Sequence, residues 1–69
     1  MKNELSILVK EKRKVLKISQ IELAEKAGVG LRFVRELEQG KKTLRLDKVN
    51  QVLILFGYQL GPVKTVKGD

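Results

Sequence analysis

Hydrophobic positions recur with helical spacing in four segments of the chain, and short polar or glycine-containing stretches separate these segments. Residues 4–17, 20–27 and 31–39 each place apolar side chains on one face, and residues 45–56 are apolar nearly all round. We therefore expect four helices over these ranges. The positions expected to line their inner faces are Leu5, Leu8, Val9, Val15, Leu16, Ile18, Ile21, Leu23, Ala24, Ala27, Val29, Phe33, Val34, Leu37, Leu46, Val49, Val52, Leu53 and Phe56, with Phe33 only partly buried.

Capping residues mark the boundaries of the expected helices. Ser19 with Glu22 three residues later forms a capping box and predicts the start of the second helix, and Asn3 can cap the first helix. Gly30 precedes the third helix and offers no side-chain oxygen to its first turn. Glycines at 28, 40 and 57 are expected to end the second, third and fourth helices.

Length and charge narrow the class of protein. The chain has 69 residues, enough for one small domain, and 15 Lys and Arg against 8 Asp and Glu give a net charge of +7. This excess favours a polyanionic partner, nucleic acid first and an anionic membrane surface second. The absence of Cys and His excludes disulfides and the usual thiolate and imidazole chemistry, so we expect no catalytic, metal or cofactor site. No apolar run is long enough to span a bilayer, and the charges from Lys10 to Lys14 argue against a signal peptide, so a cytoplasmic location is expected.

The stretch from Ser19 to Lys41 predicts two short helices that cross over a tight turn, with small residues where they approach. It resembles the helix-turn-helix of the lambda-repressor-like, or Xre, family. The matching elements are Ser19-Gln20, Leu23-Ala24, Gly28-Val29, and Leu37-Glu38 before Gly40-Lys41. The run from Arg13 to Leu60 resembles the small HipB-type antitoxin regulators. This resemblance implies a mostly α fold of four to five helices with a short C-terminal strand.

The third expected helix has five side chains on its outward face, both polar and apolar. Of these, Leu31, Arg32, Arg35 and Glu36 are the candidates for contacts with DNA bases. Arg32 is the first choice because base contacts concentrate early on a recognition helix, and Arg35 is a second base or phosphate contact. Leu31 could pack on a thymine methyl group. Glu36 could accept from cytosine or pair with Arg32 one turn away, and the salt bridge is favoured.

The resemblance implies roles for five further residues. Gln20 would contact a DNA phosphate and brace the recognition helix, and Lys41 and Lys42 would meet the phosphate backbone; the alternatives are an exposed glutamine and a solvated loop. Arg13 and Glu38 would form an ion pair inside the fold rather than touch DNA.

The C-terminal segment suggests a contact between subunits. We divide the chain into a helix-turn-helix domain at residues 1–57 and an extended arm at residues 58–69, where Tyr58, Leu60, Val63, Thr65 and Val66 favour a strand. A lone strand is disordered or pairs with a partner, and the resemblance to HipB-type proteins implies a small sheet shared by two subunits. Ile54 and Leu55 fall outside the apolar stripe of the fourth helix, so they are either dimer contacts or part of a tighter core. The predicted dimer interface comprises Ile54, Leu55, Tyr58, Leu60 and Val63.

These features together predict a homodimeric regulator that binds a palindromic operator in double-stranded DNA. The resemblance implies an autorepressor that also restrains a HipA-type Ser/Thr kinase toxin; the alternative is a plain Xre-type repressor without a toxin partner. An RNA-binding module is disfavoured because Phe33, Phe56 and Tyr58 form no stacking platform. An enzyme is disfavoured because the carboxylates are scattered over helix faces.

Overall fold

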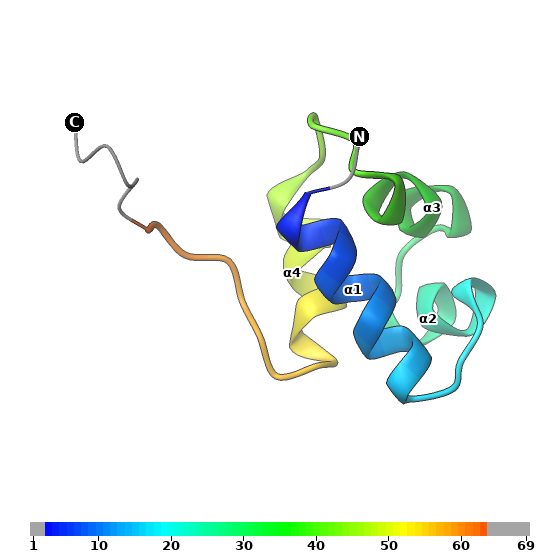
Figure 1. The fold of residues 1–69 in the computed structure, drawn as a ribbon. Helices are drawn as coiled ribbons and strands as arrows, with labels where there is room; N and C mark the ends of the chain where they lie inside the picture. The colour runs from blue at the N-terminus through cyan, green and yellow to red at the C-terminus, as the bar shows by residue number, and fades with distance from the viewer. Residues whose placement is uncertain (1–2, 64–69) are drawn as a thin grey trace.

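The computed structural model describes residues 3–63, which form four helices and an extended arm (Figure 1). The helices are α1 at Glu4–Val15, α2 at Gln20–Ala27, α3 at Leu31–Gln39 and α4 at Leu46–Ile54. Helix α3 packs against both α1 and α2, and α2 also packs against α4. Within residues 3–63 no helix is both long enough and apolar enough to cross a membrane.

The first two helices begin with the predicted capping residues. The Asn3 side chain accepts a hydrogen bond of 2.8 Å from the Ser6 amide, and the Asn3 amide donates to the Ser6 hydroxyl at 2.9 Å. Ser19 and Glu22 form the same reciprocal arrangement at the start of α2, with distances of 3.1 and 2.8 Å. These boxes satisfy amides that have no partner within the helix. Helix α3 starts at Gly30 without a side-chain cap, as predicted.

All four helices end in the same backbone motif, in which a left-handed residue is followed by an amide that bonds back into the last turn. Gly28, Gly40 and Gly57 have φ values of 74°, 84° and 81°. At the end of α1 the left-handed residue is Lys17, with φ of 58°, and the following Ile18 amide donates to the Arg13 carbonyl at 3.3 Å. Helix α1 therefore ends at Val15, and the prediction that the first helix reaches Lys17 was wrong. A lysine, unlike a glycine, does not indicate a left-handed residue in the sequence.

The buried core lies between the four helices and agrees with most of the predicted inner positions. Its buried members come from every helix: Val9, Leu23, Ala24, Val34, Leu37, Val49, Val52 and Leu53. Partly buried apolar residues surround them, including Phe33 as predicted, and also Leu5, Leu8, Ile18, Ala27, Val29 and Phe56.

Four positions predicted to face inward are instead exposed. Val15 is 73% exposed because it lies about 120° around α1 from the buried Val9. Leu16 leaves the helical face where α1 ends, and Ile21 and Leu46 lie in the first turns of α2 and α4, where no other helix covers them. Helix α4 is also shorter than the predicted range of residues 45–56, since Arg45 is its N-cap and Leu55 its C-cap.

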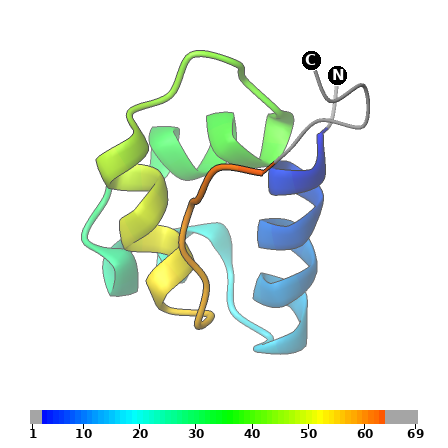
Figure 2. The same cartoon turned by 90° about the vertical axis from the view of Figure 1, so that its left-hand side faces the viewer.

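The arm leaves the end of α4, turns up beside that helix and then projects away from the helical body (Figure 1), so that in Figure 2 it passes in front of the space between α4 and α1. The Leu60 amide donates to the Asn50 side-chain oxygen at 2.8 Å, and the Leu60 side chain packs against the core. The Lys12 ammonium lies 5.5 Å from the centre of the Tyr58 ring. Residues 58–63 form no strand in this single chain. Pairing with a second subunit stays a prediction, and Thr65 and Val66 lie outside the described residues.

Candidate nucleic-acid interface

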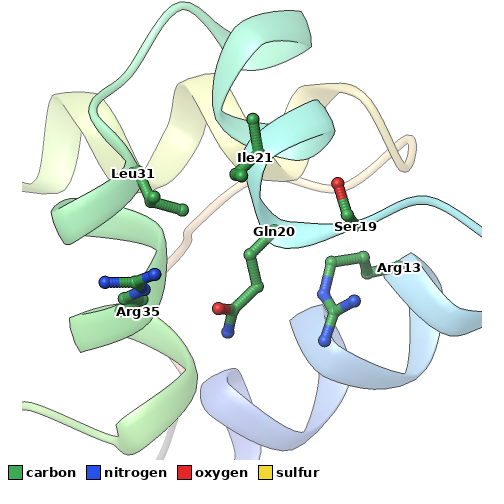
Figure 3. Close-up of a pocket in the computed structure, with 6 residues that line it drawn as sticks. All are labelled: Arg13, Ser19, Gln20, Ile21, Leu31 and Arg35. Atoms are coloured by element: carbon green, nitrogen blue, oxygen red, sulfur yellow. The ribbon is translucent and has the colours of Figure 1, made fainter.

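Gln20 and Ile21 at the start of α2 lie opposite Leu31 and Arg35 on α3 (Figure 3). A shallow hollow of about 340 Å³ separates them. The side chains around it come from α1, α2, α3 and the turn before α2: Arg13, Ser19, Gln20, Ile21, Leu31 and Arg35. The surface is therefore built by the two helices of the predicted helix-turn-helix, with α1 behind them.

A buried polar network fixes the relative positions of α1, α2 and α3. Glu38 accepts two hydrogen bonds from Arg13, from Nε at 2.7 Å and from Nη2 at 3.1 Å. Gln20 Nε2 donates to the same carboxylate at 3.0 Å. Arg13 also donates to the carbonyl of Ile18 at 3.0 Å, which anchors the turn before α2. The structure thus brings together Arg13 and Glu38, the two residues assigned to an internal ion pair.

The electrostatic environment of this network keeps Glu38 and Arg13 ionised. Burial alone raises the pKa of Glu38, but hydrogen bonds from Arg13 and Gln20 outweigh that effect, so the pKa lies below its ordinary value. The hydrogen bond to Glu38 raises the pKa of Arg13. The side chains of Arg13 and Glu38 are only 14% and 4% exposed. Glu38 is therefore an ionised, internally used carboxylate near neutral pH and not a group that faces a ligand.

Gln20 links this buried network to the surface. Its amide nitrogen is held by Glu38, while the residue stands in the first turn of α2 on the wall of the hollow. A side-chain amide has two N–H donors and one carbonyl acceptor, so one hydrogen bond to Glu38 leaves capacity for a second partner. The arrangement holds Gln20 in one orientation before any ligand binds.

The outer side of α3 carries most of the residues predicted to read bases. Arg32 has a side chain that is 92% exposed, and Arg35 is exposed one turn further along. Leu31 is half-buried at the first position of the helix. Since Val34 and Leu37 on the opposite side of α3 are fully buried, the helix has no freedom to rotate these arginines inward.

Glu36 lies between two basic side chains. Its carboxylate is 3.6 Å from Arg32 Nε, the interaction favoured from the sequence, and 3.3 Å from Lys41 Nζ. The contact with Lys41 was not predicted, because that residue lies beyond the end of α3. Lys41 and Lys42 are both exposed in the loop after Gly40. The loop and the helix therefore present neighbouring positive charges on one side of the molecule.

Ile21 is the residue of this surface that the sequence analysis placed elsewhere. Its side chain is 54% exposed and lines the hollow beside Gln20. The available signal was its position in the first turn of α2, two residues before the buried Leu23, which turns it away from the core. An apolar side chain here can contact deoxyribose or a base methyl group.

Comparison with known proteins agrees with this geometry. A helix-turn-helix family model matches residues 9–63, and the chain therefore belongs to the helix-turn-helix family. Among its relatives is a protein of Sinorhizobium fredii named as the uncharacterised HTH-type transcriptional regulator y4mF. The two are 48% identical over 54 residues, which cover 78% of this chain and 71% of that relative. These matches are to the broad family, so the narrower resemblance to HipB-type antitoxins stays a prediction.

Proposed function

We propose that this chain is a sequence-specific regulator that binds double-stranded DNA through α3. The observation that carries the proposal is the outward row of Arg32 and Arg35 on a helix whose other side is fully buried. Such a helix can enter a major groove without rearrangement. The net charge of +7 supports binding to the phosphate backbone.

The side chains of the interface divide into two roles. Arg32 reads a base, with guanine the best bidentate partner, and Arg35 contacts the next base or a phosphate. Leu31 packs on a thymine methyl group, and Glu36 orients Arg32 rather than accepting from cytosine. Three residues on the rim, Gln20, Lys41 and Lys42, bind phosphates and set the position of the helix in the groove.

The active form in this proposal is a homodimer on a palindromic operator. Two copies of α3 would reach half-sites separated by about 34 Å, one turn of DNA. The arm supplies the contact through Tyr58, Leu60 and Val63, with Ile54 beside it; Ile54 is 66% exposed and Val63 is 87% exposed, so both are accessible to a partner. Leu55 was assigned to the same contact, but it lines a separate hollow together with Leu16 and Ile18.

The resemblance of residues 13–60 to HipB-type proteins supports a second part of the proposal. The chain would repress its own operon and restrain a HipA-type Ser/Thr kinase toxin, from a cytoplasmic location. Co-expression with a kinase gene encoded beside it tests this part: a stable complex supports an antitoxin, and a failure to associate leaves a plain repressor.

The test of DNA binding is selection of duplexes from a random library, followed by titration of the selected site at several salt concentrations. Arg32→Ala should weaken binding by about 1–3 kcal/mol and relax the preference at one base pair. Lys42→Ala should weaken binding to all sequences and reduce the salt dependence by about one ion.

Lys26→Ala is the matched control, because it removes the same charge at the far end of α2. It should bind as the unmodified chain does. A selected site that tolerates Arg32→Ala without loss of affinity or sequence preference would contradict the proposed orientation, and equal binding to duplex RNA would contradict the proposed ligand.

A further inference from the structure

A second surface lies outside the nucleic-acid interface, where the end of α1 meets the end of α4. Its exposed members are Val15, Leu16 and Leu55, which are 73%, 53% and 41% exposed, and Ile18 and Phe56 lie partly buried beneath them. We call these five residues the Leu16–Leu55 face. It shares no residue with the hollow between α2 and α3, so DNA bound there leaves this face uncovered.

The shape of this face suits inserted side chains. Two adjoining hollows of about 320 and 260 Å³ share Leu16 and Leu55 as a common wall. Ile18 lines the first hollow, and Val15 and Phe56 line the second. Two neighbouring apolar concavities can receive side chains spaced by one turn on an amphipathic helix.

The charged residues at the walls of the two hollows indicate which charge a binding partner should carry. Lys26 stands at the wall of the first hollow and Lys12 at the wall of the second, so both charged wall residues are basic. A second copy of this chain on a two-fold axis would bring another Lys12 and another Lys26 to the same interface. Like charges brought together in this way oppose association, whereas carboxylates would pair with them.

From this combination we infer that the Leu16–Leu55 face binds an acidic amphipathic helix of another protein. The partner places apolar side chains in the two hollows and carboxylates near Lys12 and Lys26. The inference is independent of the DNA-binding proposal, since the face and the outer side of α3 have no residue in common. It also takes Leu55 out of the dimer contact.

The test uses a synthetic helical peptide of about three turns, with leucines one turn apart and flanking glutamates. Titration of the isotope-labelled full chain, followed by NMR, should give saturable shifts at Val15, Leu16 and Leu55. A matched peptide with lysines in place of the glutamates should bind at least about tenfold more weakly. Leu16→Ser should weaken the binding of the acidic peptide by roughly tenfold or more, because a leucine contact is lost.

Leu46→Ser is the matched control, since Leu46 is 68% exposed but lines a different hollow beside the arm. It should bind the peptide normally, and Leu16→Ser should keep its DNA affinity. Equal binding of both peptides, absence of saturable shifts, or shifts confined to the arm would overturn the inference. An altered sedimentation of the Leu16→Ser variant in the absence of peptide would also overturn the inference, because it would assign the face to a second copy of the chain. Binding to anionic vesicles that depends on Leu16 would overturn it as well.

Discussion

The C-terminal arm and the polar network behind α3 differ in how firmly each is held. Glu38 joins residues from α1 and α2 through three hydrogen bonds of 2.7 to 3.1 Å, and its side chain is 4% exposed. Beyond the end of α4, where the Tyr58 amide donates to the Leu53 carbonyl at 3.0 Å, the described part of the arm rests on the hydrogen bond from the Leu60 amide to the Asn50 side chain, a ring contact with Lys12 and the packing of Leu60. The first set of contacts fixes the positions of α1, α2 and α3 relative to one another, and the second set holds the arm only weakly.

The difference has an energetic basis. A buried carboxylate that loses its partners keeps the full cost of desolvation, whereas an exposed group that loses a partner is hydrated again. Rigid placement of α2 and α3 therefore depends on all three side chains of the network at once. The arm can detach at a cost of about one hydrogen bond and a modest amount of apolar burial, which suits a segment proposed to pair with a second subunit.

The largest effect is expected for Glu38→Ala. The substitution leaves Arg13 charged and largely buried without its carboxylate, and it frees Gln20, so we expect a loss of about 3 kcal/mol of unfolding free energy. Urea denaturation measures this loss. Glu36→Ala removes an exposed carboxylate and should cost less than about 1 kcal/mol. Similar stabilities for the two variants would show that the buried network contributes no more than a surface ion pair.

Acid should weaken the same network more gradually. The pKa of Glu38 is lowered in the folded state from an ordinary value near 4.5. Its contribution to stability is therefore fully present above pH 4.5 and is lost as the pH falls through the lower folded-state pKa. Thermal unfolding between neutral pH and about pH 2 measures this loss. Glu38→Gln should be less stable at neutral pH and should show a smaller acid dependence; an unchanged dependence would assign it to other carboxylates.

Much of the network's framework could be predicted from the sequence. The apolar spacing placed the core of α2, α3 and α4, the N-cap residue Asn3 and the capping box at Ser19 placed two helix starts, and the family resemblance paired Arg13 with Glu38. The resemblance also implied that Gln20 braces α3, which its hydrogen bond to Glu38 confirms; that Glu38 is the partner was not predicted, because it depends on the crossing geometry of α2 and α3 and not on spacing along the chain.

The ends of α1 and α4 were harder to predict. Helical periodicity continued through Val15 and Leu16, but Val15 lies away from the buried side of α1, and Leu16 leaves the helical face where the helix ends before the left-handed Lys17. Leu46 fits the apolar stripe of α4, yet no helix covers its first turn. The position of Leu60 beside Asn50 depends on how the chain turns after Gly57. Strand propensity does not predict that turn.

A smaller effect is expected for Asn50→Ala, which removes the hydrogen bond to the Leu60 amide. We expect a loss of about 1 kcal/mol of global stability and a larger relative increase in the hydrogen-exchange rate of that amide. Amide exchange followed by NMR measures both. Gln59→Ala, in the exposed part of the arm, is the control and should leave the exchange unchanged. If Leu60 exchanges equally fast in both variants, Asn50 does not hold the arm.

The smallest effect is expected for the contact between Lys12 and Tyr58. A lysine near an exposed aromatic ring contributes about 0.5–1 kcal/mol, and Tyr58 is 44% exposed. Tyr58→Leu keeps an apolar side chain and removes most of the ring's attraction for the ammonium group, so a double-mutant cycle with Lys12→Met isolates that attraction. We expect a coupling of about 0.5 kcal/mol that changes little with salt. A coupling above about 2 kcal/mol would mean that the arm is anchored as firmly as the helices, and would argue against its exchange between subunits.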